Sequence, residues 1–175
     1  LPYSTHERNS REGVNGKISG RTHEIQRLVG RSLRGVIDLE ALGEKTIWLD
    51  CDVIQADGGT RTASINGCYI ALILAVQKLI KSQKIVKNPV REAVAAISVG
   101  IYQDTPLLDI CYEEDSKASV DMNIVMTEGG KYIEIQGTAE HHPFSAQEME
   151  GMLGLASSGL KNIFQIQKKQ LDHDS

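Results

Sequence analysis

A short turn between two apolar segments carries the residues best suited to binding an anion: Gly58, Gly59, Thr60 and Arg61. Two glycines allow backbone N–H groups to approach a charged group closely, and the first turn of a helix adds the positive end of its dipole. The hydroxyl of Thr60 and the guanidinium of Arg61 are donors suited to phosphate oxygens. The same residues also fit a simple strand-to-helix turn capped by Thr60, and their spacing alone leaves both interpretations open.

Two carboxylates, Asp115 and Asp121, flank a predicted hairpin bend and form a second candidate site. They are close enough to share a hard divalent cation such as Mg²⁺, which needs one or two protein carboxylates and takes water and phosphate oxygens as its other ligands. The alternative is that both are solvated acids of a turn. His141 and His142 are neighbours, and adjacent residues of a strand face opposite sides, so we do not expect them to bind a metal together.

The net charge of −4 conceals a basic front. Residues 1–35 contain seven Lys and Arg residues against three Glu residues, which gives +4, so the rest of the chain carries −8. Six of the seven cations are arginines: Arg8, Arg11, Arg21, Arg27, Arg31 and Arg34. Arginine is suited to planar recognition of phosphate and carboxylate, so this front favours an anionic polymer as partner. The alternative is a solvated helix face whose arginines pair with acids elsewhere.

Hydrophobic periodicity predicts the elements that position these residues. Helices are expected over 21–42, over 62–82, and from the Ser145-x-x-Glu148 capping box to about Gln170. Strands are expected over 46–55, 93–102, 107–112, 120–127 and 131–136, the last four forming an antiparallel meander. In the strand over 107–112, Leu108, Ile110 and Tyr112 are expected to share one face. This order predicts an α+β or α/β layered domain with one main sheet.

Length and composition fit one globular core. The chain has 175 residues, of which 41% are hydrophobic and 24% charged, and no apolar stretch reaches membrane-spanning length. Cys51, Cys68 and Cys111 form neither a C-x-x-C pair nor a zinc spacing, so we expect reduced thiols in a cytosolic protein. No Ser-His-Asp order, Cys–His pair or Walker sequence is present. The chain opens with Leu1-Pro2 and has no signal-peptide pattern, so we expect a segment upstream.

Eight stretches spread over the chain form a recognisable set. They are Ser4-Thr5-His6-Glu7-Arg8-Asn9, Gly20-Arg21-Thr22, Glu24-Ile25-Gln26-Arg27-Leu28, Leu49-Asp50-Cys51-Asp52-Val53, Gln55-Ala56-Asp57-Gly58-Gly59-Thr60-Arg61-Thr62-Ala63-Ser64-Ile65, Glu114-Asp115-Ser116, Asp121-Met122-Asn123 and Glu134-Ile135-Gln136-Gly137-Thr138-Ala139-Glu140. Together they closely resemble the ribonuclease PH family of phosphate-dependent, tRNA-trimming exoribonucleases. The resemblance runs from Leu1 to about Leu171, so no single motif has to carry it.

The resemblance implies a phosphorolytic 3′→5′ exoribonuclease, or tRNA nucleotidyltransferase. In this family inorganic phosphate is the co-substrate: it attacks the terminal phosphodiester of tRNA precursors or other structured RNA and releases a nucleoside 5′-diphosphate. The site residues implied by the match are Arg21, Gly59, Thr60 and Arg61 for phosphate, Asp115 and Asp121 for catalysis and for Mg²⁺ or Mn²⁺, and Arg8 and Arg11 for RNA. Arginine forks and a metal would neutralise the repulsion between phosphate and phosphodiester.

The resemblance also implies an α+β fold, a β-α-β-α sandwich with a mixed sheet and packed helices. It implies a single domain over 1–175 that lacks the family's N-terminal strands. It further implies a cytoplasmic homohexamer, a trimer of dimers, that has no membrane contact and processes tRNA and rRNA. Tyr3 stands where the family commonly has arginine, which is expected to weaken tRNA binding or ring assembly. The alternative function is a catalytically weak or inactive RNA-binding ring subunit, which the retained site residues disfavour. A polynucleotide phosphorylase core is disfavoured because that family usually adds RNA-binding domains.

Overall fold

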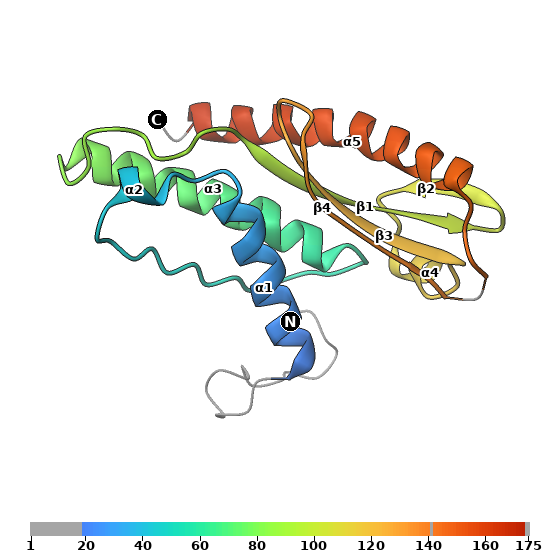
Figure 1. Cartoon of the computed structure of the whole chain (residues 1–175). Coiled ribbons are helices and arrows are strands. Elements are labelled where there is room, and N and C mark those ends of the chain that lie inside the picture. The colour runs from blue at the N-terminus through green and yellow to red at the C-terminus, as the bar shows by residue number, and fades with distance from the viewer. Residues whose placement is uncertain (1–18, 141, 174–175) are drawn as a thin grey trace.

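The structure, a computed structural model, describes residues 19–140 and 142–173. In these residues three helices precede two strand pairs that are separated by a short helix, and a long helix follows, as in an α+β protein (Figure 1). The elements are α1 (Gly20–Arg34), α2 (Leu39–Leu42), α3 (Thr60–Lys81), β1 (Val94–Tyr102), β2 (Thr105–Leu108), α4 (Tyr112–Asp115), β3 (Val120–Thr127), β4 (Tyr132–Ala139) and α5 (Ala146–His173).

The four strands form one sheet in the order β2-β1-β3-β4. β1 and β2 are joined by Gln103 and Asp104, whose positive φ angles of 50° and 59° suit a two-residue hairpin turn. In β3, Asp121 is paired with Gly100 of β1 on one side and with Thr138 of β4 on the other. All these pairings are antiparallel as predicted, but the sheet is not the predicted meander, because β1 lies between β2 and β3. The mixed sheet expected from the resemblance is not found among the described strands.

Helices cover both faces of this sheet, which explains why β1 is apolar on both sides instead of alternating (Figure 1). Val94 and Ala96 pack in a core cluster with residues of α1 and α3. Ala95 and Ile97 belong to a second cluster with residues of α5. The packing of α5 is close, because a Cβ at Gly159 would lie 2.7 Å from the Ile97 side chain. β1 is therefore the central support on which α3 and α5 are placed.

Most of the predicted elements are confirmed. The helix expected over 62–82 is α3, and the strands expected over 93–102, 120–127 and 131–136 are β1, β3 and β4, with ends that differ by up to three residues. The capping box of the last helix is also present. The Ser145 N–H donates to Glu148 Oε2 at 2.6 Å, and the Glu148 N–H donates to Ser145 Oγ at 3.2 Å.

Among the described residues, α3 is the one helix whose length and apolar composition would allow it to cross a membrane. The core helix of a globular protein passes the same test. Seven residues of α3 are buried, and the helix contacts α1, α5 and the sheet, which is the environment of a core helix.

The single helix predicted over 21–42 is wrong, because α1 ends at Arg34 and α2 starts only at Leu39. Val36 and Ile37 leave the helix to enter the core cluster under α3, where they are 1% and 9% exposed. Asp38 then caps α2 by accepting hydrogen bonds from two of its N–H groups at 3.1 Å. Burying these two side chains and capping α2 with Asp38 together stabilise the chain more than a continued helix would.

The strand predicted over 46–55 is also wrong, since no described strand pairs with this segment. Ile47 and Leu49 pack against the core cluster, while Trp48 between them is 90% exposed. The segment therefore has the alternating burial of a strand without its hydrogen bonds.

The strand predicted over 107–112 ends earlier than expected, because β2 covers Thr105–Leu108. Asp109 has a φ of 55°, which breaks the strand, and Tyr112 begins α4. Leu108, Ile110 and Tyr112 therefore do not share a strand face. Nor do Asp115 and the residues before β3 form a simple hairpin, because β1 lies between β2 and β3 in the sheet.

Candidate active site

α3 begins at two glycines with positive φ and without a side-chain cap. Gly58 has a φ of 85° and Gly59, the N-cap residue, has a φ of 55°, conformations that residues with a Cβ rarely adopt. Thr60 is the first residue of the helix, so the alternative of a turn capped by Thr60 is wrong. Gly59 has no side chain to accept from the first N–H groups of α3, and donors at the positive end of a helix dipole are suited to an anion.

Close backbone packing holds this turn against the segment that leads into α4. A Cβ at Gly58 would overlap with the carbonyl oxygen of Ile110 and crowd Cys111. The Tyr112 N–H also donates to Asp57 Oδ1 at 3.3 Å. Because α4 ends at Asp115, this contact joins the Gly58-Gly59 turn to the segment that carries the first candidate carboxylate.

Replacing Gly58 with alanine is expected to lower the free energy of unfolding by about 2–4 kcal/mol, because the strain of positive φ and the overlap with Ile110 both act. Gly130 offers a matched control, since its φ is 83° and an added Cβ would meet no atom within 4 Å. Gly130→Ala should cost only about 1 kcal/mol. Urea unfolding of both variants measures the difference, and equal losses would show that the contact with Ile110 is not limiting.

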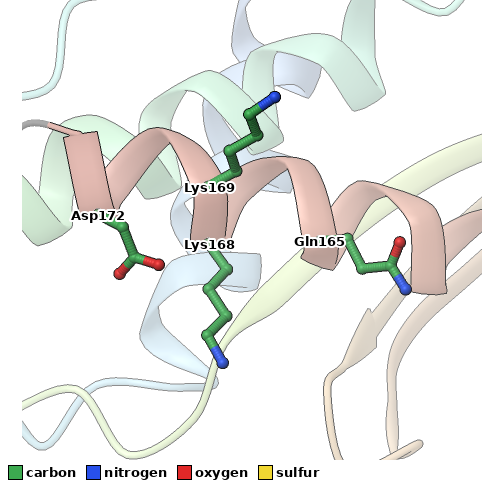
Figure 2. Close-up of a pocket in the computed structure, with 4 residues that line it drawn as sticks. All are labelled: Gln165, Lys168, Lys169 and Asp172. Atoms are coloured by element: carbon green, nitrogen blue, oxygen red, sulfur yellow. The ribbon is translucent and has the colours of Figure 1, made fainter.

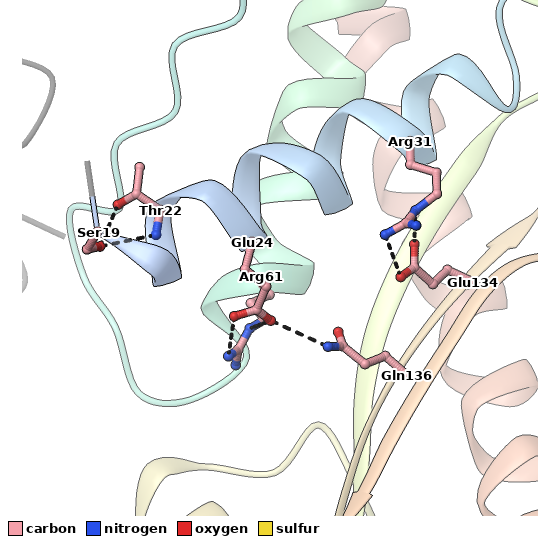
Figure 3. A network of polar contacts seen from close by, with 7 residues as sticks. All are labelled: Ser19, Thr22, Glu24, Arg31, Arg61, Glu134 and Gln136. Atoms are coloured by element: carbon pink, nitrogen blue, oxygen red, sulfur yellow. Dashed lines mark hydrogen bonds and ion pairs between the residues drawn. The ribbon is translucent and has the colours of Figure 1, made fainter. Parts of the chain in front are cut away.

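Arg61 is held by Glu24 of α1, which is in turn contacted by Gln136 of β4 (Figure 3). Its Nε donates to Glu24 Oε1 at 3.1 Å and its Nη2 donates to Glu24 Oε2 at 3.3 Å, a two-pronged ion pair. The Gln136 amide donates to Glu24 Oε1 at 3.4 Å. Arg61 lowers the pKa of Glu24 through this hydrogen bond, and Arg21, one turn earlier on α1, lowers it further through its charge. The structure thus brings Arg21 and Arg61, both predicted phosphate ligands, to the same carboxylate.

Within the described part of the chain, one of the three arginines Arg27, Arg31 and Arg34 on α1 pairs with an acid of another element, as the alternative to an RNA-binding front had expected. Arg31 forms an ion pair with Glu134 of β4, with Nε to Oε2 at 2.8 Å and Nη2 to Oε1 at 3.1 Å (Figure 3). Arg27 and Arg34 are exposed. The Arg31–Glu134 pair is a second link between α1 and β4, parallel to the one through Glu24.

Asp121 of β3 lies in the electrostatic field of the other candidate residues. Burial raises the pKa of the half-buried Asp121 carboxyl above its usual value, and the negative charges of Asp115 and then Glu140 raise it further, while Arg61 opposes them. The charges of Asp115 and Arg61 therefore both act on Asp121, although the three residues come from α4, α3 and β3. Repulsion between two carboxylates is relieved when a cation binds or when one carboxyl is protonated.

The remaining predicted residues are less informative. Arg8, Arg11, Tyr3 and His141 lie outside the described residues. Within 19–140 and 142–173, no group of three or more His, Cys, Asp or Glu side chains is arranged to hold a metal ion. The shallow hollow shown in Figure 2 lies on the C-terminal part of α5 and is lined by Gln165, Lys168, Lys169 and Asp172, none of them a predicted site residue.

Sequence analysis did not single out Glu24 or Gln136 as site residues. The sequence did contain one indication for Glu24, because it lies three residues after Arg21 on a predicted helix and therefore on the same face. It contained no indication for Gln136, which is 112 residues from Glu24 along the chain.

Comparisons with known proteins agree on one family. Residues 1–78 match domain 1 of the 3′ exoribonuclease family, and residues 92–159 match domain 2. Ribonuclease PH of Bacillus subtilis (strain 168) is 56% identical over 172 residues, which is 98% of this chain and 70% of that protein.

Two solved structures share the fold at 17% identity. Rrp46 of rice (Oryza sativa) has a TM-score of 0.66 over 90% of this chain and 68% of its own. A chain of the Archaeoglobus fulgidus exosome, solved with RNA bound to the active site, has a TM-score of 0.69 over 94% of this chain and 66% of its own. The expected ribonuclease PH-like α+β fold is thus confirmed, and the chain belongs to the 3′ exoribonuclease family, as a homologue of ribonuclease PH.

Proposed function

We propose that inorganic phosphate binds at the start of α3 and attacks the terminal phosphodiester of an RNA, releasing a nucleoside 5′-diphosphate and an RNA shorter by one nucleotide. Its family makes the chain a phosphorolytic 3′→5′ exoribonuclease of the tRNA nucleotidyltransferase type. The observation that carries the proposal is the contact between the Gly58-Gly59 turn and the segment 110–115. This contact supports an anion site next to the segment that ends at Asp115.

The phosphate site would combine backbone and side-chain donors. The first N–H groups of α3 and the Thr60 hydroxyl would bind phosphate oxygens, and Arg61 and Arg21 would neutralise their charge. The buried hydroxyl of Ser98, which has no hydrogen-bond partner among the described residues, lies beside Gly59 and supports a polar ligand there. Two anions must meet for this reaction, so positioning and neutralisation are the main contributions of the protein.

Asp115 and Asp121 fit a divalent cation, and we propose that they hold Mg²⁺, or Mn²⁺ in its place. The raised pKa of Asp121, caused by burial and by the charge of Asp115, is the observation in favour, because a bound cation would offset both. Hard cations of this type accept two carboxylates and take their other ligands from water and phosphate. When bound, the metal would supply charge stabilisation at the reacting phosphorus.

We propose tRNA precursors as the main substrates, with Arg8 and Arg11 contacting the RNA backbone. Assembly into a homohexamer in the cytoplasm is part of the same proposal, supported by the identity to ribonuclease PH. We also propose that 1–175 acts as one domain, since one core cluster contains residues from both family-matched parts, such as Ile65 and Val94.

The test is to incubate an RNA that has a free 3′ tail with the protein and Mg²⁺, with and without phosphate. Nucleoside diphosphate should form only with phosphate, and excess diphosphate should extend the RNA, because the bond broken and the bond formed are similar in energy. Sulfate in place of phosphate serves as the control, since it can bind but yields no diphosphate. Nucleoside monophosphates formed without phosphate would instead show hydrolysis. RNA binding without any turnover would support the RNA-binding ring subunit.

A further inference from the structure

The ion pair of Glu24 and Arg61 occupies only one edge of the guanidinium. Of the five N–H donors of an arginine, Glu24 accepts one from Nε and one from Nη2. Of the three that remain, one on Nη1 points back toward the aliphatic stem, while the other Nη1 donor and the second Nη2 donor form the end edge of the guanidinium. That edge is itself a fork of the kind that binds phosphate oxygens in pairs.

The ion pair with Glu24 and the nearby charges restrict the orientation of the Arg61 side chain. Glu24 comes from α1 and is itself contacted by Gln136 of β4, so two elements outside α3 fix the carboxylate. The Arg61 charge also acts on Asp121 of β3. A long side chain with about 2 kcal/mol of rotamer entropy is thus restrained before any ligand arrives.

We propose that Glu24, supported by Gln136, is a positioning residue that holds Arg61 so that the free edge of its guanidinium faces the phosphate. This inference rests on the proposed function, because it assumes that Arg61 binds the attacking phosphate. Glu24 does not touch the reacting atoms in the proposal and acts through Arg61 alone.

Because Glu24 is negatively charged, the proposal can be tested by whether its removal strengthens or weakens phosphate binding. A carboxylate close to a phosphate site repels the ligand, so removing its charge should strengthen phosphate binding if charge is all that Glu24 contributes. If Glu24 orients Arg61, its removal should weaken phosphate binding despite the more positive site. The two ideas therefore predict opposite changes in the KM for phosphate.

The variants are Glu24→Gln, which keeps the shape of the side chain and loses its charge, and Glu24→Ala, which also loses every contact to Arg61. The matched control is Glu134→Gln, since the Arg31–Glu134 pair also joins α1 to β4 but contacts no predicted phosphate ligand. We expect kcat/KM for phosphate to fall about 10-fold in Glu24→Gln and about 100-fold in Glu24→Ala, mostly through KM. Glu134→Gln should stay within about 2-fold of the wild type, because Glu134 contacts Arg31 and no predicted phosphate ligand.

Steady-state phosphorolysis gives these constants, and calorimetric titration of the same proteins with inorganic phosphate gives its Kd independently of turnover. Unchanged or tighter phosphate binding in both Glu24 variants would overturn the proposal. An equal loss in Glu134→Gln would also overturn it, because the effect would then come from the link between α1 and β4. A wild type that binds phosphate without turnover would refute the proposed function alone, with the Kd values still deciding the role of Glu24. A wild type that binds no phosphate would refute both.

Discussion

Replacing Arg61 with alanine is expected to lower kcat/KM for phosphate by about 1,000-fold, through the loss of a preorganised cation at the site of attack. Arg61 lies in the first turn of α3, directly after the two glycines, so its charge adds to the positive end of the helix. Arg61→Lys keeps the charge but loses the planar fork and the two-pronged contact with Glu24. The lysine variant should therefore recover only a small part of the activity.

The control for Arg61→Ala is Arg31→Ala, which removes an arginine from a comparable ion pair with an acid of β4. It should reduce phosphorolysis by about 2-fold or less. Affinity for RNA, measured by gel shift without phosphate, should be largely kept in both variants. If Arg61→Ala retained most of its phosphorolysis, or if it lost RNA affinity in proportion to activity, Arg61 would not be the phosphate ligand.

The parts of the fold that were predicted correctly are those in which side-chain pattern and backbone pairing coincide. β1 and β3 are central strands whose apolar runs are covered by helices, and α3 and α5 have enough turns to show their period. In the segment 46–55 the side-chain pattern is that of a strand, but the backbone pairing is missing. Ile47 and Leu49 pack against the core, but the backbone of this segment pairs with no described strand, so alternation predicted a strand that does not form.

The other errors come from local turns that periodicity does not detect. The apolar pattern continues through Val36 and Ile37, yet these residues are buried by leaving the helix. Asp109 ends β2 by adopting a positive φ, which aspartate tolerates better than most residues with a Cβ. That bend is what turns the chain toward α4 and thus toward Asp115.

The candidate site was predictable to the extent that it is local in sequence. The residues from Gly58 to Arg61 form one turn, and their types already made an anion site one of two open interpretations. Glu24 and Gln136 became visible only in the structure, because their role depends on contacts among α1, α3 and β4. The two carboxylates were identified by position, while the electrostatic link from Asp121 to Arg61 required the sheet register and the helix packing.

Replacing Asp121 with asparagine is expected to abolish turnover, by about 1,000-fold or more, and at the same time to stabilise the protein by about 0.5–1 kcal/mol at neutral pH. The fold holds this carboxylate at a cost, because burial and the charge of Asp115 raise its pKa. Asparagine keeps the size of the side chain and removes the charge, so it should relieve that cost. Melting temperature and phosphorolysis of the same samples measure the two effects.

The sign of the pH dependence follows from the direction of the shift. In the unfolded chain Asp121 titrates near its usual pKa of 3.8, and in the folded protein at a higher pH. Below pH 3.8 the group is protonated in both states, so Asp121→Asn should then change stability little. As pH rises through the folded pKa, ionisation destabilises the wild type, and the advantage of the variant should grow and then level off.

In the wild type, Mg²⁺ at neutral pH should remove most of this difference, because a cation between Asp115 and Asp121 would stabilise the ionised form. A variant that is less stable than the wild type at neutral pH without metal would show that Asp121 is held by favourable contacts, and would argue against a strained catalytic carboxylate at this position.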